Sequence, residues 1–243
     1  QYGMVIDLKR CFGCMTCVTS CKMANNGSKN VFYNRVLTRP GLSDEDLADE
    51  AAIDTARGSY PDGLKRVQIP LACQHCANPA CESVCPTRAT SKDPETGIVS
   101  VDPDLCIGCG SCMLACPYHG VRTMLQKEPA NNLGFDCGEA DAPEHEGRVV
   151  EKCTMCSHLT SAGEKPACVK NCCGTARFYG DLDDPNSDVS QELAKYPAEA
   201  IHHLPDVGNG PLSAYILSPK FGTWAGKDVH QTTSKYMTTE GSV

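Results

Sequence analysis

The fold of this chain is decided by two short runs, CQHCANPACESVCP at residues 73–86 and CIGCGSCMLACP at residues 106–117. Each run carries four cysteines, in the spacings C-x2-C-x4-C-x3-C-P and C-x2-C-x2-C-x3-C-P. Three thiolates on a tight loop can surround one face of a compact inorganic cluster, whereas the fourth, one helical turn further on, points away toward another cluster. One such run therefore needs a partner run nearby, and here the partner lies just upstream.

The same two patterns occur a second time in the chain. Residues 6–21, IDLKRCFGCMTCVTSC, match residues 101–116, VDPDLCIGCGSCMLAC, at a constant offset of 95. Residues 153–172, CTMCSHLTSAGEKPACVKNC, keep the C-x-x-C and P-A-C-x-x-x-C of residues 73–85 but lengthen the loop between them from four residues to eleven. We number the runs one to four in chain order, beginning at Cys11, Cys73, Cys106 and Cys153. The two types therefore alternate along the chain.

Three kinds of site compete as explanations of the sixteen run cysteines. A disulfide framework would have to pair these cysteines at very short range. A zinc site normally joins two C-x2-C pairs about 12 to 20 residues apart, so that both meet at one tetrahedral ion. The spacing C-x2-C-x2-C-x3-C-P is instead typical of cubane 4Fe-4S clusters. Because all four positions of every run are cysteine, we expect four such cubes rather than a degenerate 3Fe-4S centre in one of them.

The pairing of the runs follows from chain length. Only twenty residues separate Cys85 from Cys106, so runs two and three are expected to form one ferredoxin-like module, and runs one and four the other by default. The crossing hypothesis assigns the first three cysteines of a run to one cluster and its fourth to the cluster of the partner run. The predicted ligand sets are Cys11, Cys14, Cys17 and Cys172 (set 1), Cys73, Cys76, Cys81 and Cys116 (set 2), Cys106, Cys109, Cys112 and Cys85 (set 3), and Cys153, Cys156, Cys168 and Cys21 (set 4).

These pairings predict an α+β fold with two bacterial-ferredoxin-like modules, one nested in the other, and two 4Fe-4S clusters in each. The predicted parts are an outer module of residues 1–30 and 148–190, an inner module of residues 69–125, inserts at residues 31–68 and 126–147, and a C-terminal extension of residues 191–243 that contacts a partner. Short strands are expected at 4–6 and 98–101, a hairpin turn at 93–97, and a helical turn between the third and fourth cysteines of every run.

The regions between and after the runs carry weaker signals. In the first insert, Ser43 followed by acidic residues predicts an acidic helix that ends near Gly58. Gly, Pro and acidic residues predict an irregular loop over residues 118–152, and Ser187 predicts the cap of a short helix. The polar tail from Ser218 onward is expected to order only against another subunit.

Residues beside the cysteines have expected roles of their own. Gly13 and Gly108 stand where the backbone should pass close to a cube, and Phe12 and Ile107 can shield it from water. Four further side chains that flank the runs are expected to pack or to bond at the surface rather than to tune clusters: His75, Tyr118, His119 and His158.

Two cysteines stand outside the sixteen. Cys137 is expected to be a free thiol. Cys173 occupies the place that a proline fills in run two, and its exchange with Cys172 as a ligand is the alternative.

Charge and hydropathy limit the class of protein. The formal net charge is −8, and four oxidised cubes with their thiolates would add about −8 more. A chain this acidic is not expected to bind nucleic acid or an anionic membrane surface. No apolar run approaches the ~18 residues that span a bilayer. The N-terminal residues QYGMVIDLKRC show neither a signal segment nor a twin-arginine pair, so we expect a soluble or peripheral chain, either cytoplasmic or exported as the passenger of a twin-arginine-targeted partner.

With both run types in view, the chain resembles the four-cluster iron–sulfur subunits of the dimethyl sulfoxide reductase family of molybdopterin or tungstopterin oxidoreductases. The resemblance covers roughly residues 3–24 and 69–190, and its most specific segments are CQHCANPACESVCP, VDPDLCIGCGSCMLACPY, EKCTMCSH with KPACVKNC, and ARFYGDLDDPNSDVS. The chain departs from the family at Cys173, where proline is usual, at Leu159, where a basic residue is common, and in both inserts.

The resemblance implies a subunit with no substrate site. Such subunits relay single electrons through four 4Fe-4S clusters between a large pterin-bearing catalytic subunit and a quinone-linked membrane anchor subunit or a soluble carrier. A free polyferredoxin that shuttles electrons is the alternative. An enzyme with its own active site has little support, because no Gly-rich nucleotide loop or nucleophile elbow is present in the sequence.

Overall fold

The computed structural model describes residues 1–40, 66–118, 120–127, 142 and 144–217. Several sequence predictions fall outside these residues: the acidic helix from Ser43 to Gly58, the side chains of His119 and Cys137, and the tail from Ser218. None of the described helices has the length and apolar character that a membrane span needs.

A four-stranded sheet in the order β8-β1-β10-β9 collects strands from both ends of the chain. Its central strand β1 (Tyr2–Asp7) pairs antiparallel with β8 (Arg177–Asp181) and parallel with β10 (Ala214–Ile216), and β9 (Ile201–His203) forms the edge beside β10. The strands β1 and β10 are apolar and buried along their length because side chains pack on both faces, as is usual for strands covered on two sides.

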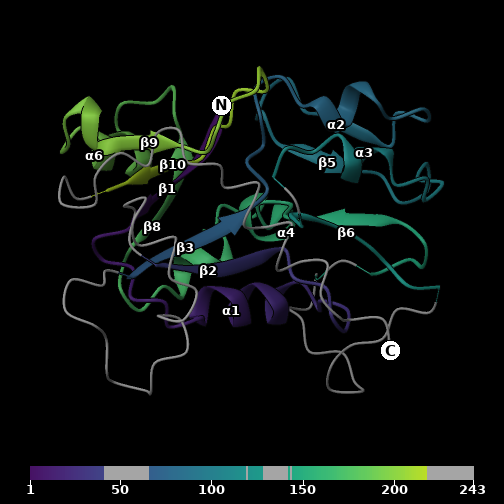
Figure 1. Ribbon diagram of the computed structural model, residues 1–243, viewed down its shortest axis with the longest axis horizontal. Coiled ribbons are helices and arrows are strands. Elements are labelled where there is room, and N and C mark those ends of the chain that lie inside the picture. The colour runs from purple at the N-terminus through teal and green to yellow at the C-terminus, as the bar shows by residue number, and fades with distance from the viewer. Residues whose placement is uncertain (41–65, 119, 128–141, 143, 218–243) are drawn as a thin grey trace.

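The two faces of this sheet bury different partners. On one face Val5 and Ile216 pack with Val189 of α6 (Asp188–Leu193), and on the other Ile6 and Tyr215 belong to the main core. The predicted cap of α6 is confirmed, since the Ser187 side chain accepts a hydrogen bond from the backbone of the third helical residue. Figure 1 shows α6 and this sheet at one end of the long axis, with α2 and α3 at the other.

The position of β9 and β10 differs from the expectation for residues 191–243. These strands are hydrogen-bonded members of the central sheet, and the ring of Tyr215 is fully buried. Its hydroxyl donates to the Pro70 carbonyl at 3.0 Å, which ties this region to the strand before run two. The strands β9 and β10 are therefore part of the central sheet. The three-residue strands are too short to show a period in the sequence.

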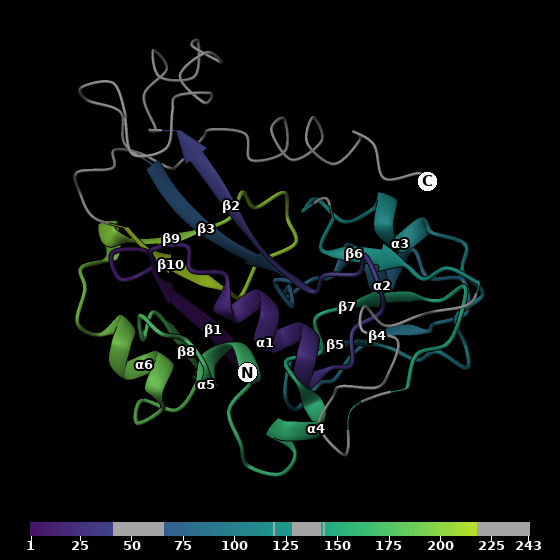
Figure 2. The same ribbon diagram turned by 90° about the horizontal axis from the view of Figure 1, so that it is seen from below.

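Two further strand pairs frame the inserts. The long ribbon of β2 (Asn34–Pro40) and β3 (Arg66–Ala72) has a register from Asn34↔Ala72 to Pro40↔Arg66, and in Figures 1 and 2 it crosses the middle of the molecule beside α1. The second pair joins β6 (Arg122–Met124) to β7 (Val150–Lys152). The ends of the expected irregular loop over residues 118–152 are thus paired strands, and the sequence analysis missed both ribbons.

The helices predicted between third and fourth cysteines are all present. They are α1 (Thr16–Ala24), α2 (Ala80–Ser83), α3 (Ser111–Leu114) and α5 (Ala167–Lys170). Helix α1 packs against α5, and α2 packs against α3. The predicted hairpin is also confirmed, as β4 (Thr90–Lys92) pairs with β5 (Val99–Val101). The long loop of run four contains the short helix α4 (Ser157–Thr160), and the 3-10 helix η2 (Ala198–Ala200) leads into β9.

Candidate iron–sulfur cluster sites

The backbone of each run is bent by residues in the left-handed region, and these residues recur at equivalent positions. Positive φ angles occur in pairs one repeat apart, at Gly13 and Gly108, Met15 and Gly110, His75 and Met155, and Arg88 and Thr175. Non-glycine residues adopt this conformation rarely, so its recurrence at nonidentical residues shows that the cysteine spacing imposes the loop shape. The internal repeat read from the sequence is therefore also a repeat of conformation.

Two of these left-handed positions are glycines with close neighbours. A Cβ on Gly13, at φ +74°, would lie 2.7 Å from the side chain of Gln68, and one on Gly108, at φ +65°, would overlap the Arg148 carbonyl oxygen. The close neighbours that the structure shows at these glycines are protein groups, and the approach to a cube stays a prediction. In run one the neighbour is a flexible side chain, and in run three it is backbone.

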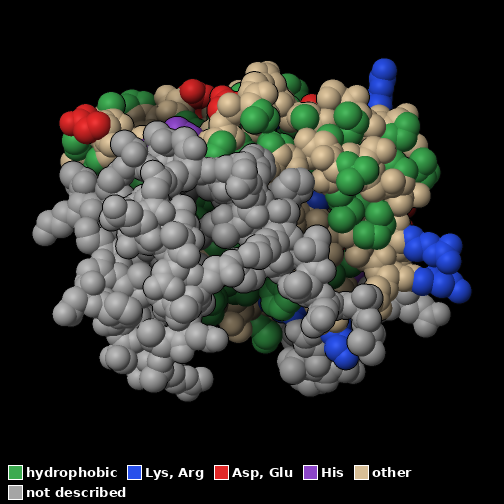
Figure 3. Space-filling model, viewed as in Figure 1, with side chains coloured by type: hydrophobic (Ala, Val, Ile, Leu, Met, Phe, Trp, Pro, Cys, Tyr) green, Lys and Arg blue, Asp and Glu red, His purple; other side chains and the backbone are tan. Residues whose placement is uncertain are grey.

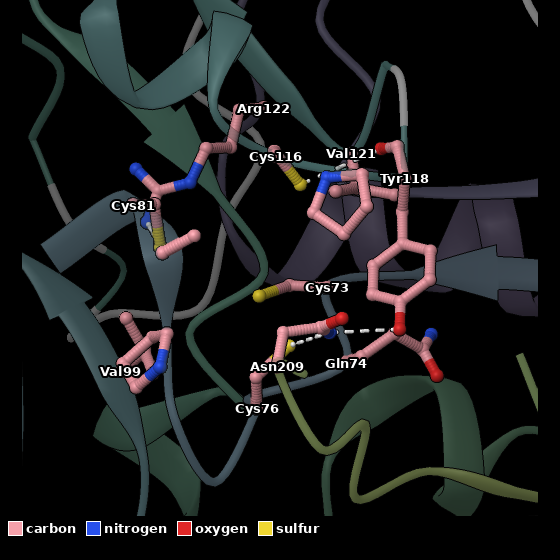
Figure 4. Close-up of a pocket in the computed structure, with 13 residues that line it drawn as sticks. Cys73, Gln74, Cys76, Cys81, Val99, Cys116, Tyr118, Val121, Arg122 and Asn209 are labelled. Carbon is pink, nitrogen blue, oxygen red and sulfur yellow. Dashed lines mark hydrogen bonds between the residues drawn. The ribbon is translucent and has the colours of Figure 1, made fainter. Parts of the chain in front are cut away.

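One pocket is lined by all four cysteines of set 2. Figure 4 shows Cys73, Cys76 and Cys81 of run two around this pocket together with Cys116 from run three. The remaining lining includes Val99, Tyr118 and Val121, which are largely apolar or buried. Three cysteines of one run and the fourth of its neighbour thus line a single cavity. The crossing of the ligands stays a prediction.

A second pocket repeats this arrangement for set 1. Its lining includes Cys11, Cys14 and Cys17 of run one with Cys172 of run four. Cys173 lies outside this group: its sulfur is exposed and stands 3.3 Å from the Thr16 hydroxyl. Cys172 thus lines the pocket of set 1, whereas Cys173 lies at its exposed edge beside Cys14 and Thr16.

The cysteines of sets 4 and 3 differ in burial and in the charges around them. All four cysteines of set 4 are buried: Cys153, Cys156, Cys168 and Cys21. Burial raises the pKa of the Cys21 thiol well above its usual value, and the charges of Cys153, Cys168 and Cys156 raise it further. In set 3, the hydroxyl of Ser111 lowers the pKa of Cys109, and the nearby charge of Cys85 from run two opposes this.

Polar groups aimed at sulfur also recur in both halves. The backbone amides of Thr90 and Ala176 donate to the sulfurs of Cys85 and Cys172 at 3.4 and 3.3 Å. The hydroxyls of Thr16 and Ser111 lie 3.4 and 3.5 Å from the sulfurs of Cys14 and Cys109. Hydrogen bonds to thiolate ligands stabilise negative charge at a metal cluster and tune its reduction potential. The chemistry of the donor set therefore fits thiolate ligands.

Three further side chains donate hydrogen bonds to cysteine sulfurs and were not predicted from the sequence. Arg122 of β6 donates to the sulfur of Cys81 at 2.9 Å, and the Asn209 amide donates to the sulfur of Cys76 at 3.0 Å and to the Tyr118 hydroxyl at 2.8 Å (Figure 4). Asn25 reaches the sulfurs of Cys21 and Cys156 at 3.8 and 3.7 Å. No local pattern marks Asn209, because it arrives from a turn 133 residues after its sulfur partner.

Burial makes several of these thiols hard to ionise. It raises the pKa of Cys116 and of Cys153 to about 12, and that of Cys76 to about 11. Cys73 is different: burial opposes ionisation there as well, but the Lys152 and His75 side chains lower its pKa to about 5. Binding of iron would therefore displace protons from the cysteines whose pKa is raised, and nearby cations reduce that cost.

The flanking histidines have unequal surroundings. His75 is fully buried and its Nδ1 accepts a hydrogen bond from the Val99 amide at 3.0 Å, so the ring lies beside Cys73 rather than at the surface. Within the described residues neither ring nitrogen of His158 has a hydrogen-bond partner. His75 is thus packed in the interior, and it also lowers the pKa of Cys73.

The sets follow one another in the order 1, 4, 2, 3. The Cys17 charge raises the pKa of Cys168, which links set 1 to set 4, and the Cys73 charge raises that of Cys153, which links set 4 to set 2. Sets 2 and 3 belong to runs whose helices α2 and α3 are in contact. The two ends of this order carry the exposed cysteines, Cys14 in set 1 and Cys109 in set 3.

Large apolar side chains surround both exposed ends. Phe12 of run one is 64% exposed and lines the pocket of set 1, and Ile107 of run three is 66% exposed. Their shielding of a cluster stays a prediction. Figure 3 shows hydrophobic side chains spread over the end of the molecule that holds α2 and α3. Further exposed apolar residues of the inner runs are Val84, Leu105 and Leu114.

Comparison with known proteins finds iron–sulfur protein families. The chain matches a family described as a 4Fe-4S dicluster domain over residues 65–134 and 139–182, and one described as a 4Fe-4S binding domain over residues 8–24. It is 43% identical over 221 residues to an iron–sulfur protein of Halobacterium salinarum that is named as a putative dimethyl sulfoxide reductase subunit, covering 89% of this chain and 79% of that protein.

Two other relatives belong to different reductases. The arsenate respiratory reductase iron–sulfur subunit of Shewanella sp. strain ANA-3 is 35% identical over 247 residues, with 90% of this chain and 97% of that protein covered. A tetrathionate reductase subunit of Salmonella typhimurium is 34% identical over 217 residues, with 89% and 72% covered. These relatives are subunits of reductases rather than free carriers, which favours a subunit over a polyferredoxin shuttle. The chain belongs to the iron–sulfur electron-transfer subunits of the dimethyl sulfoxide reductase family of molybdopterin oxidoreductases.

Proposed function

We propose that this chain relays single electrons through four 4Fe-4S clusters held by sets 1 to 4. The observation that carries the proposal is the composition of the two pockets, each lined by three cysteines of one run and the fourth cysteine of another. When bound, 4Fe-4S clusters supply one-electron redox chemistry with little structural change. The chain itself contributes the thiolates, the hydrogen bonds that stabilise them, and surroundings that exclude water.

The same contacts support a nested arrangement of two modules. Helix α1 of run one packs against α5 of run four, and α2 of run two packs against α3 of run three. We assign sets 1 and 4 to an outer module of residues 1–30 and 148–190, and sets 2 and 3 to an inner module of residues 69–125. The inserts 31–68 and 126–147 and the region after residue 190 would then connect the modules and face partners.

The order of the sets suggests how electrons cross the chain. Sets 4 and 2 lie between sets 1 and 3 in this order, and the exposed Cys14 and Cys109 mark two ends at which electrons can enter and leave. A non-catalytic subunit of this form would connect a large molybdopterin or tungstopterin catalytic subunit with a quinone-linked membrane anchor subunit or a soluble carrier. The relatives support such a complex, since they are named as iron–sulfur subunits of reductases.

The crossing of ligands is tested by substitution of the fourth cysteines. We expect Cys21→Ser to weaken the cluster that Cys153→Ser also removes, and to leave intact the cluster that Cys11→Ser removes. Iron content and low-temperature electron paramagnetic resonance of the reduced, anaerobically purified protein provide the readout. As a matched pair in the inner runs, Cys116→Ser should affect the same signal as Cys73→Ser. Loss of the Cys11-dependent signal in Cys21→Ser would contradict the crossing.

The subunit role is tested by native purification. We expect the chain to elute with a large partner that contains molybdenum or tungsten. A stable monomer of 26.0 kDa that carries a full set of clusters would contradict it.

A further inference from the structure

Three buried cations stand among the cysteine sets. Arg122 is 3% exposed, Arg177 is 4% exposed and Lys152 is 2% exposed, although arginine and lysine are rarely buried unless a negative group accompanies them. Each lies on a strand next to a run: Arg122 on β6, Lys152 on β7 and Arg177 on β8. The strands thus carry positive charge into the interior of an acidic chain.

Each of the two arginines lies close to cysteines of two sets. Arg122 bonds to the sulfur of Cys81, and its pKa, which burial lowers, is raised by thiolates of both set 2 and set 3, including Cys112. Arg177 lies among Cys168, Cys17 and Cys153, which belong to sets 4 and 1. These positions place one guanidinium within the inner runs and one within the outer runs.

Lys152 is the cation that joins the inner runs to the outer runs. It immediately precedes Cys153 of set 4, and its Nζ donates to the Cys153 carbonyl at 2.7 Å. The same Nζ donates to the carbonyl of Val99, a residue that lines the pocket of set 2. Val99 is held to run two from its other side as well, because its amide donates to His75. The ammonium group is therefore fixed by one contact on each side of the boundary between sets 4 and 2.

Burial of the Lys152 ammonium group would be unfavourable without a negative group beside it. Its cross-strand partner in the β6–β7 pair is Arg122, so two cations face each other at one register position. Like charges directly opposite in a sheet repel, and a buried charge needs a partner of opposite sign. Burial lowers the pKa of Lys152, and the negative charge that Cys73, Cys153 and Cys81 carry as thiolate ligands opposes this. The arrangement fits a cation placed between two anionic clusters.

We propose that Lys152 acts on electron transfer as a fixed positive charge that raises the reduction potentials of the two central clusters, those of sets 4 and 2. Reduction adds one negative charge to a cluster, and a nearby cation stabilises that charge with little screening when water is excluded. Lys152 is a positioning residue in this role, because it accepts no electron itself. The inference rests on the proposed function, since it requires clusters in both sets.

Two neutral variants and one charged variant separate charge from structure. Lys152→Met removes the charge and the hydrogen bonds, Lys152→Gln removes the charge but keeps a donor, and Lys152→Arg keeps the charge. The measurement is a potentiometric titration of the purified cluster-loaded protein followed by electron paramagnetic resonance. The serine variants described above identify which signal belongs to which set.

We expect the potentials of sets 4 and 2 to fall in Lys152→Met and in Lys152→Gln, while those of sets 1 and 3 keep their values. Lys152→Arg should leave all four potentials in place. Arg177→Met should instead lower sets 1 and 4. As a surface control, Lys165→Met removes a charge whose side chain is 56% exposed and close to run four in sequence, and it should shift none of the four.

Several outcomes would overturn the inference. Potentials of sets 4 and 2 that stay unchanged in both neutral variants, or an equal fall in all four sets, would show that the Lys152 charge does not act on the central pair. If only Lys152→Arg retains full iron content, the residue is needed for assembly and its role is structural. Failure of the proposed function is distinguishable, because the unmodified protein would then not titrate as four 4Fe-4S clusters.

Discussion

The inner cysteine runs, two and three, and the outer runs, one and four, share one local plan in different surroundings. Their left-handed residues and their helices occur at equivalent positions. Their burial differs, because the outer runs pack beside the central sheet and the β2–β3 ribbon, whereas the inner runs are framed by short hairpins. The buried cysteines of the outer runs are Cys17, Cys21, Cys153, Cys156 and Cys168, and those of the inner runs are Cys73 and Cys112. Ligand geometry is thus a local property, and exclusion of water is a tertiary one.

The largest expected effect is a difference in stability between a protein that lacks a buried ligand and one that lacks an exposed ligand. Cys153 belongs to the main hydrophobic core, and Cys109 is exposed at the end of the inner runs. We expect Cys153→Ser to cost at least about 4 kcal/mol of stability, since it removes a cluster ligand and leaves a hydroxyl in the core. Cys109→Ser should lose its own cluster and keep the fold. Anaerobic thermal unfolding and iron content measure both, and equal destabilisation would mean that the two halves do not differ in packing.

The next effect compares the two equivalent glycines. We expect Gly108→Ala to destabilise the protein by about 2 to 3 kcal/mol, because its Cβ would meet the backbone carbonyl of Arg148 and its φ is positive. Gly13→Ala should cost about 1 kcal/mol less, since the Gln68 side chain can move aside. Denaturation of the cluster-loaded proteins measures the difference. A larger loss for Gly13→Ala would place the tighter approach in the outer runs.

A smaller effect concerns the donor that reaches set 2 from far along the chain. Asn209→Leu removes the bond to the Cys76 sulfur, and we expect about tenfold faster loss of the set 2 cluster to a chelator together with a lower potential. Tyr118→Phe keeps the bond from Asn209 to the Cys76 sulfur and serves as the control. Its effect on the activation free energy of cluster loss should be less than about half that of Asn209→Leu. An unchanged rate in Asn209→Leu would show that the backbone alone holds set 2.

The smallest expected effect is a pH dependence confined to the outer runs. The His145 side chain is 7% exposed and contacts the Glu151 carboxylate at 2.5 Å and the Asn25 carbonyl at 2.8 Å. Burial alone would lower the pKa of His145, but the bond to Glu151 raises it above the ordinary 6.5. The protonated ring therefore stabilises the fold fully below pH 6.5, and this contribution is lost as the pH rises through the folded-state pKa.

The test of this pH dependence uses His145→Gln. We expect the unmodified protein to lose thermal stability on going from about pH 6 to pH 8.5, by no more than about 1.4 kcal/mol for each unit by which the pKa is raised. His145→Gln should flatten the profile. Chelator release of clusters at the two pH values shows where the effect lies, and a change in sets 2 and 3 rather than in set 4 would contradict an outer origin.

The structural features that were predicted correctly from the sequence are local ones. The helical turns, the β4–β5 hairpin and the cap at Ser187 depend on residues within a few positions of one another. The prediction that groups Cys172 with run one depended only on the number of residues that separate the runs. Asn209, Lys152 and the β1–β10 pair were missed because each depends on contacts between residues far apart, and no spacing or period records them.

The parallel pairing of β1 with β10 has a consequence for the making of the protein. Residues 5–7 have their partners at residues 214–216, so the outer half cannot be completed until nearly the whole described chain has left the ribosome. The inner runs close within a far shorter segment and can fold during synthesis, as local units generally do first. We expect iron to enter the inner sites early and the outer sites last. A nascent chain arrested near residue 190 would then hold iron in the inner sites alone, as isotope-labelled iron on stalled chains would show.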